Sequence, residues 1–194
     1  IDLSKKILSQ KSSDFSSHEA SSSFLFDISM LFEYFIRKLI KRTGIILRSK
    51  YAQNYKISAG VNTGYMRKIE PDIVLESAEG LYIFDVKYKT FDSRFGVGRE
   101  DIFQLHTYIG QYANEAQIKG CGFIYPISEK KWTSLNLDST KGVISSLIKQ
   151  HGVDIRFHVV FFKISEDNFD FNLSMRNESL DFCTRLKEKI IQMV

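Results

Sequence analysis

The sequence predicts an α/β fold, because helical and strand periodicities both occur within a chain of single-domain length. Apolar residues recur at helical spacing from Ile28 to Lys41 and again from Arg99 to Ala116. Between these segments two apolar runs flank a short polar loop, which is typical of a β-hairpin, and residues 155–164 form a largely apolar run expected to be a buried strand. At 194 residues the chain can bury one sizeable core and need not form two domains.

Composition narrows the class of protein. Aromatic residues make up 13% of the chain and only two prolines occur, which indicates a globular rather than a disordered protein. The net charge of +4 is compatible with a nucleic-acid partner but does not by itself argue for one. Cys121 and Cys183 lie far apart without a CxxC spacing, so neither a zinc site nor an iron–sulfur cluster is predicted, and their scarcity fits a reducing, cytoplasmic setting. No apolar run approaches the roughly 20 residues of a membrane span and no signal peptide is evident.

The first 23 residues differ in composition from the rest. Residues 4–23 include nine serines and few large apolar side chains, so residues 1–23 are expected to be a linker or lead-in and residues 24–194 the folded domain. Because the chain begins with Ile1, we expect it to be either trimmed or one piece of a longer protein.

The first predicted helix, Ile28 to Lys41, carries one acidic residue beside its apolar stripe. Asp27 or Ser29 can provide the N-cap. Glu33 lies roughly 115° from the centre of the stripe at about 100° per residue, so it can point into a cleft beside the core. On this segment alone, a solvated acid on an amphipathic helix is the more common outcome.

The predicted hairpin joins Ile73–Leu75 to Leu81–Tyr88 through a loop that closes on Gly80, with four or five connecting residues expected. A turn centred between Ala78 and Glu79 would place Asp72 opposite Asp85. Like charges so paired, with Cβ atoms about 4.5–5.5 Å apart, are destabilising.

Two opposed carboxylates suggest a shared divalent cation, since hard cations take oxygen ligands. Strand alternation puts Lys87 on the same face as Asp85. A hairpin with one solvated face would show the same alternation, and on pattern alone this reading is equally common. Against it, Leu81 and Ile83 share the face of Asp85 and Lys87, so that face is not simply solvated.

The segment after the hairpin is basic. Residues 90–99 contain two glycines and two arginines and, with Lys87 and Lys89, could meet phosphates, although an ordinary surface loop is equally common. In the second predicted helix Gln104 and Tyr108, four residues apart, lie next to each other on the flank of the apolar face.

The last third of the chain offers fewer signals. His158 is interpreted as a packed core histidine rather than a metal ligand. Neither a phosphate-binding GxxxxGK[ST] or GxGxxG loop nor a GxSxG nucleophile motif occurs. We expect strands over Cys121–Ile127, Trp132–Leu137 and Ile155–Ile164, with helices over Lys141–Gln150 and Ser179–Met193.

Four ordered motifs in this chain resemble the PD-(D/E)xK nuclease superfamily, and the Q-x-x-x-Y element resembles its RecB-type branch. The motifs are Glu33 on a first helix, Pro71-Asp72, Asp85-Val86-Lys87 and Gln104-xxx-Tyr108. More narrowly, four segments resemble the nuclease domain of McrC-type subunits of modification-dependent (5-methylcytosine) restriction systems, over about Phe24 to Tyr125: F-L-F-D-I-S-M-L-F-E-Y-F, P-D-I-V-L, F-D-V-K-Y-K and D-I-F-Q-L-H-T-Y.

The resemblance implies a restriction-endonuclease-like fold, a central mixed β-sheet flanked by helices, and a metal-dependent DNA endonuclease. It implies that Asp72, Asp85 and the Val86 carbonyl bind Mg²⁺ or Mn²⁺ and that Glu33 completes or tunes the metal site. Lys87 would orient the attacking water or stabilise the developing charge. Gln104 and Tyr108 would position the scissile strand or the lysine. The chemistry is metal-assisted phosphodiester hydrolysis.

The resemblance also implies partners. Family members carry an N-terminal part that engages an AAA+ GTPase motor subunit, and nothing in this sequence corresponds to it. The serine-rich lead-in is expected to mark where that part was cut off or is separately encoded. Recognition of methylated cytosine belongs to the motor partner, so this chain need not read it. Cutting both DNA strands needs two sites, which predicts a dimer on DNA.

Two alternatives stay open. The chain could be a stand-alone RecB-like or type II-like nuclease that needs no motor. An upstream or neighbouring AAA+ GTPase gene would favour the motor-driven complex instead. The chain could also be a non-catalytic DNA-binding or scaffolding module on the same fold. The complete set of Asp72, Asp85 and Lys87 argues against this last reading.

Overall fold

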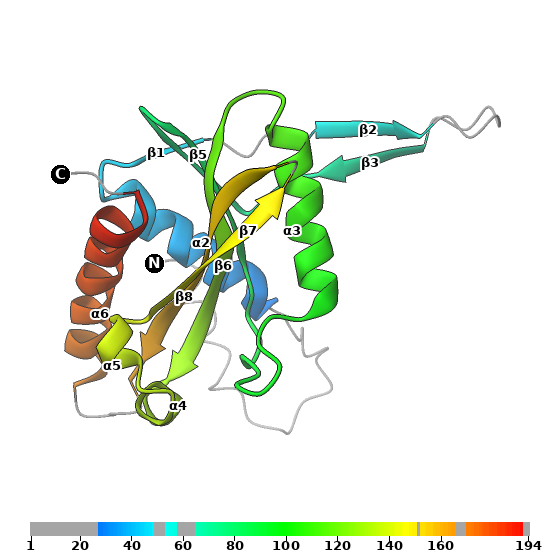
Figure 1. The fold of residues 1–194 in the computed structure, drawn as a ribbon. Helices are drawn as coiled ribbons and strands as arrows, with labels where there is room; N and C mark the ends of the chain where they lie inside the picture. The colour runs from blue at the N-terminus through cyan, green and yellow to red at the C-terminus, as the bar shows by residue number, and fades with distance from the viewer. Residues whose placement is uncertain (1–26, 49–52, 58–64, 151, 166–169, 192–194) are drawn as a thin grey trace, which may run out of the picture.

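The computed structural model describes residues 27–48, 53–57, 65–150, 152–165 and 170–191 (Figure 1). The predicted lead-in, residues 1–23, lies outside these ranges. The elements in chain order are α2 (Ile28–Lys41), β1 (Ile46–Leu47), β2 (Gln53–Ile57), β3 (Tyr65–Ile69), β4 (Ile73–Ser77), β5 (Gly80–Val86), α3 (Arg99–Tyr112), β6 (Ile118–Ser128), α4 (Glu129–Ser134), α5 (Leu137–Thr140), β7 (Val143–Gln150), β8 (Val153–Ile164), α6 (Phe171–Arg185) and a π-helical segment (Leu186–Ile191).

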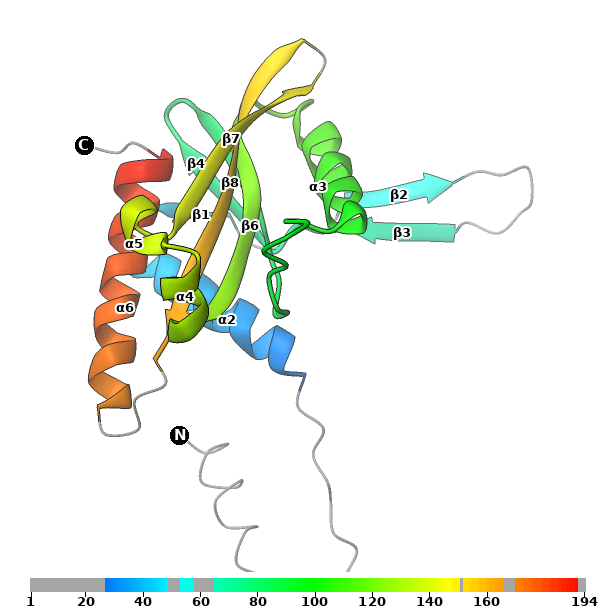
Figure 2. The same ribbon diagram turned by 60° about the horizontal axis from the view of Figure 1, so that its bottom comes forward.

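The fold is α/β, with a six-stranded mixed sheet in the order β1-β4-β5-β6-β8-β7. The central pairs β5–β6 and β6–β8 are parallel, whereas β1–β4, β4–β5 and β7–β8 are antiparallel. Strands β2 and β3 form a separate antiparallel ribbon that extends away from the body beside α3 (Figures 1 and 2). The predicted α/β class and the mixed sheet flanked by helices are therefore confirmed.

Helices cover both faces of the sheet. Helices α2 and α6 lie on one side and α3 on the other, as Figure 1 shows. The residues of β5 alternate between the two cores: Tyr82, Phe84 and Val86 pack with α2 and α6, and Leu81 and Ile83 pack with α3. Burial on both faces makes β5 a rigid base for the residues at its end. None of the described helices is long and apolar enough to cross a membrane.

The hairpin has the predicted register but a shorter loop. Ser77 pairs with Gly80 and Ile73 with Phe84, so only Ala78 and Glu79 connect the strands, not four or five residues. Only glycine fits at the end of this turn, because a Cβ at position 80 would lie 2.2 Å from the Gln117 carbonyl oxygen and Gly80 has φ +145°.

Two predictions for the last third are wrong. The segment expected to be a strand, Trp132–Leu137, instead spans α4 and the start of α5, and the Ser128 side chain caps α4 by accepting from the Lys131 N–H. The segment expected to be a helix, Lys141–Gln150, forms β7, because all of β7 pairs with β8. Pairing along a long neighbouring strand outweighs weak local preference here.

Pro126 shows why a proline can lie inside a paired strand. The carbonyl of Ile124 accepts from the Lys87 N–H on the β5 side of β6. Two residues on, Pro126 faces the same side, but β5 has already ended at Val86, so no ladder bond is lost.

Candidate active site

The structure places the two aspartates of the predicted site opposite each other at the ends of β4 and β5. Continuing the register beyond Ile73 and Phe84 brings Asp72 across from Asp85. An Asp72 carboxylate oxygen, Oδ2, accepts from the Val86 N–H at 2.7 Å. The backbone carbonyl of Asp72 accepts from the Arg37 guanidinium of α2. Asp72 is thus held through both its side chain and its backbone.

Asp85 is a buried acid with charged and polar partners. Its side chain is 2% exposed, and its Oδ2 lies 2.7 Å from the Lys87 Nζ. Burial raises the pKa of the Asp85 carboxyl above its ordinary value, the charge of Asp101 adds to that rise, and hydrogen bonds from Lys87 and Tyr108 oppose it. A carboxylate in this setting is stabilised by any further positive charge brought beside it.

Lys87 remains protonated in this arrangement. Burial alone would lower the pKa of its ammonium group, but the hydrogen bond and charge of Asp85 and those of Asp101 outweigh burial and raise the pKa. A lysine with a raised pKa is a poor general base and a good source of fixed positive charge. The geometry therefore suits Lys87 to stabilising negative charge rather than to taking a proton.

Gln104 and Tyr108 connect Lys87 back to Asp85. The Lys87 Nζ donates to Gln104 Oε1 at 2.7 Å, and Gln104 Nε2 donates to the Tyr108 hydroxyl, also at 2.7 Å. Tyr108 in turn hydrogen-bonds to Asp85, and burial raises the pKa of its hydroxyl so that it remains a donor. Their spacing of four residues on α3 brings the two side chains to the same flank, as the sequence predicts.

Asp101 belongs to this cluster and was missed by the sequence reasoning. It lies in the first turn of α3 and is 6% exposed. The Lys87 Nζ is 3.2 Å from its Oδ1, and the Lys89 Nζ donates to its Oδ2 at 2.5 Å. Burial opposes ionisation, but the two lysines outweigh it and lower the pKa of Asp101. Acidic residues are common in the first turn of a helix because they interact favourably with the helix dipole, so Asp101 alone gives no functional signal. The one signal in the sequence is the pair Lys87 and Lys89, whose alternation places both on one face where they can share an acidic partner.

Glu33 lies near the same end of β5 but is not brought into a three-acid cluster. It is half-buried and one helical turn before Arg37, whose side chain reaches Asp72. The preceding Phe32 packs on Tyr88 with ring centroids 5.7 Å apart. Among the described residues, no three or more His, Cys, Asp or Glu side chains form a group that could hold a metal ion.

The donor set that remains fits a hard divalent cation. Asp72 and Asp85 could supply carboxylate oxygens. The Val86 carbonyl is expected on the Asp72 side, because the Val86 N–H points there. Mg²⁺ is commonly bound through one or two carboxylates, with water and substrate phosphate completing its octahedron. Two opposed aspartates at a strand end meet that requirement without a third acid.

A hollow adjoins this cluster at the base of the β2–β3 ribbon. Its volume is about 350 Å³, and it is lined by Ile69, Glu70, Gln104, Thr107 and Tyr108. The polar flank of α3 that holds Lys87 thus also borders open space that a substrate could enter.

Comparison with known families gives one match. A family model described as "McrBC 5-methylcytosine restriction system component" matches residues 1–126, which include every residue of the predicted site from Glu33 to Tyr108. A comparison with curated proteins gives no match.

Proposed function

The chain belongs to the family of McrBC 5-methylcytosine restriction system components, and on that premise we propose that it is the DNA-cleaving member of such a system. Its reaction would be hydrolysis of a phosphodiester bond with Mg²⁺ or Mn²⁺. The observation that supports this most is the charged cluster at the end of β5, where Asp72 faces Asp85 and a protonated Lys87 is held beside them.

In this proposal Asp72, Asp85 and the Val86 carbonyl would hold the cation, with Glu33 tuning the site from α2. A bound cation would lower the pKa of a coordinated water and neutralise phosphate charge. Lys87 would stabilise the charge that develops on the phosphate oxygens. Gln104 would keep Lys87 oriented by accepting from its Nζ, and Tyr108 would hold Gln104 in place by accepting from its Nε2.

We further propose that a McrB-like AAA+ GTPase motor subunit drives cleavage and selects methylated DNA. Two copies of the chain would act together on duplex DNA, since one site hydrolyses one strand.

Two alternatives make different predictions. A stand-alone RecB-like or type II-like nuclease would use the same cluster without a motor. A non-catalytic DNA-binding module would not need its chemistry. The hydrogen-bonded set of Asp85, Lys87, Gln104 and Tyr108 favours catalysis, because binding alone does not require a buried acid beside a lysine.

The test is a cleavage assay on methylated and unmethylated plasmid with Mg²⁺, with and without the candidate motor subunit and GTP. We expect linear product from methylated plasmid only when the motor and GTP are present, and none from Asp85→Asn. Cutting without the motor would support the stand-alone nuclease, and nicked plasmid alone would contradict paired action. DNA binding without cleavage under all conditions would support the non-catalytic module.

A further inference from the structure

The loop between β5 and α3, residues 90–98, presents an aromatic ring to solvent. Phe95 is 76% exposed, more than any other large apolar side chain that the structure describes. Exposing a phenylalanine to this extent forfeits the stabilisation that its burial would give. A single exposed ring is common on a protein surface, so a binding role for Phe95 depends on the groups around it.

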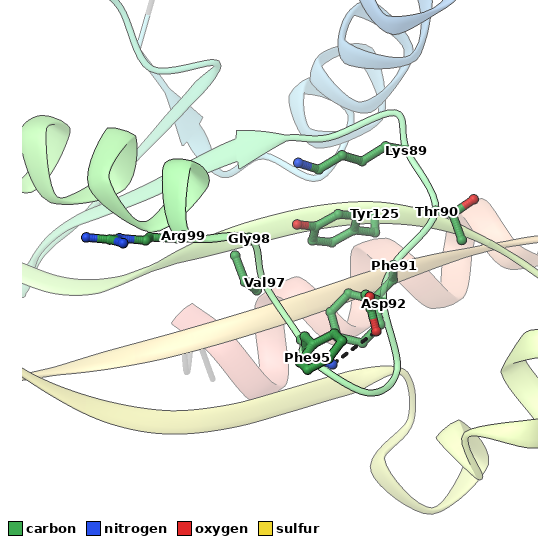
Figure 3. A pocket seen from close by; sticks show the side chains of 10 residues that line it. Lys89, Thr90, Phe91, Asp92, Phe95, Val97, Gly98, Arg99 and Tyr125 are labelled. Carbon is green, nitrogen blue, oxygen red and sulfur yellow. Dashed lines mark hydrogen bonds between the residues drawn. The ribbon is translucent and has the colours of Figure 1, made fainter.

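The exposure of Phe95 is imposed by a well-anchored loop. At the start of the loop Phe91 is buried, with its ring centroid 5.0 Å from that of Phe161, and its carbonyl accepts from Lys131 Nζ at 2.8 Å. The Asp92 carboxylate then accepts from the N–H groups of Arg94 and Phe95 at 2.8 and 3.0 Å. Figure 3 shows Asp92 reaching the backbone of Phe95. These bonds fix the turn that points Phe95 outward.

One arginine lies against the ring, and two further cationic side chains line the same hollow as the ring does. The Arg94 guanidinium carbon lies 5.0 Å from the centroid of Phe95. Behind the loop is a hollow of about 460 Å³, a size typical of small-ligand sites, and it is lined by Lys89, Phe95, Arg99 and Tyr125 among others (Figure 3). Aromatic rings interleaved with arginine and lysine are the combination that binds single nucleic-acid strands.

This surface is continuous with the proposed active site. Lys89 lines the hollow and also donates to Asp101, the acid that Lys87 contacts. Burial raises the pKa of the Tyr125 hydroxyl, which lines the same hollow, and the charges of Asp101 and Asp85 raise it further. A strand whose phosphate lies at Lys87 would therefore pass Lys89 and reach the loop.

We infer that Phe95 stacks on a nucleobase of the DNA strand being cut, while Lys89, Arg94 and Arg99 contact the phosphates on either side. The inference rests on the proposed function and adds a strand-binding site outside the charged cluster. Stacking needs an exposed base face, so the loop would hold a nucleotide that is unstacked from its neighbours. The positive charges of Lys89, Arg94 and Arg99 complement the phosphates of that strand.

Binding of a short single-stranded oligothymidylate, measured without divalent metal, tests this without requiring cleavage. Phe95→Ala and Phe95→Leu should each weaken binding by about tenfold, the usual cost of losing one base–aromatic stack. Phe95→Trp should retain affinity. The matched control is Phe171→Ala, which removes an exposed phenylalanine from the start of α6 on the other side of the sheet and should leave binding unchanged.

Tryptophan fluorescence gives a second readout, because a nucleobase stacked on an indole quenches it. The oligothymidylate should quench Phe95→Trp beyond the baseline set by Trp132 in the wild-type chain, and should not do so in Phe171→Trp. Equal weakening by Phe95→Ala and Phe171→Ala, or an unquenched Phe95→Trp, would overturn the inference.

The two proposals fail in different ways. A wild-type chain that cuts DNA while its Phe95 variants bind normally contradicts only the stacking role. Quenching at position 95 in a chain that never cuts contradicts only the nuclease. A wild-type chain that does not bind the oligothymidylate overturns the stacking role whatever its activity with a motor.

Discussion

At the scale of single residues, the site depends on how one lysine is held. Lys87 contacts Asp85, Asp101 and Gln104 at once, so its three ammonium hydrogens all have acceptors. A lysine restrained from three directions loses little further freedom when substrate binds. This preorganisation is what makes fixed charge effective in catalysis.

Asp101 is therefore expected to act as a positioning residue. Asp101→Asn should lower the rate of cleavage at saturating DNA and Mg²⁺ by about 10- to 100-fold, as for other groups that orient a catalytic side chain. The Mg²⁺ concentration for half-maximal rate should not change, since Asp101 is not in the proposed ligand set. Asp101→Glu should recover part of the rate.

The control for that measurement is Glu100→Gln, which neutralises an exposed acid in the same helical turn. It should leave the rate within about twofold, because exposed charges are screened by solvent. A normal rate in Asp101→Asn, or a large change in its Mg²⁺ requirement, would show that Asp101 does not act through Lys87.

At the scale of elements, the hairpin and the first helix could be predicted and the β7–β8 pair could not. The register that opposes Asp72 and Asp85 follows from where the polar turn lies between two apolar runs. The bounds of α2 follow from its apolar spacing and the Asp27 cap, whose side chain accepts from the Ser29 N–H. Both signals are local in sequence.

The features that could not be predicted, strand β7 and the role of Asp101, depend on contacts between residues far apart in the sequence. Strand β7 has mixed local preference and becomes a strand because β8 is beside it. Asp101 joins the site because the tertiary fold brings the start of α3 against Lys87 and Lys89. Contacts made across the sequence in this way leave no periodicity to read, so these features emerge only in three dimensions.

His158 shows how burial between strands affects stability, and it confirms the prediction of a core histidine. It is 2% exposed in β8, where it pairs with Gly122 of β6 and its Nδ1 lies 2.8 Å from the Ser145 hydroxyl of β7. A Cβ at Gly122 would lie 1.8 Å from the His158 carbonyl oxygen, so only glycine fits opposite it. Burial lowers the pKa of His158 from 6.5 to about 4.

Because the pKa of His158 is lowered, the folded chain binds fewer protons than the unfolded chain between about pH 4 and pH 6.5. Stability should be full above about pH 6.5 and fall as the pH drops toward 4, by about 3 kcal/mol in total for this group. Urea unfolding at pH 7.5 and 5 measures this loss. His158→Asn should reduce the pH dependence, whereas exposed His106→Gln should keep it, and an unchanged slope in His158→Asn would rule out this origin.

At the scale of the whole molecule, the sheet brings distant parts of the chain to one end of β5. Helix α2 supplies Arg37, the ends of β4 and β5 supply the aspartates and the lysine, and α3 supplies Gln104 and Tyr108 on the opposite face. All of these lie within the residues that the family model matches. The remaining strands β7 and β8 and helix α6 complete the core rather than the charged cluster.

The central claim is that this cluster hydrolyses DNA with a divalent cation, and the most direct measurement is the cleavage rate as a function of Mg²⁺ concentration. We predict no cutting without metal and a saturable rate with it. Lys87→Ala should lower the saturated rate by about 10²- to 10³-fold with little change in the Mg²⁺ requirement, as expected for loss of a charge-stabilising group. Asp85→Asn should instead abolish cutting or raise that requirement sharply. Cleavage without divalent metal, or cleavage that survives both substitutions, would contradict the account.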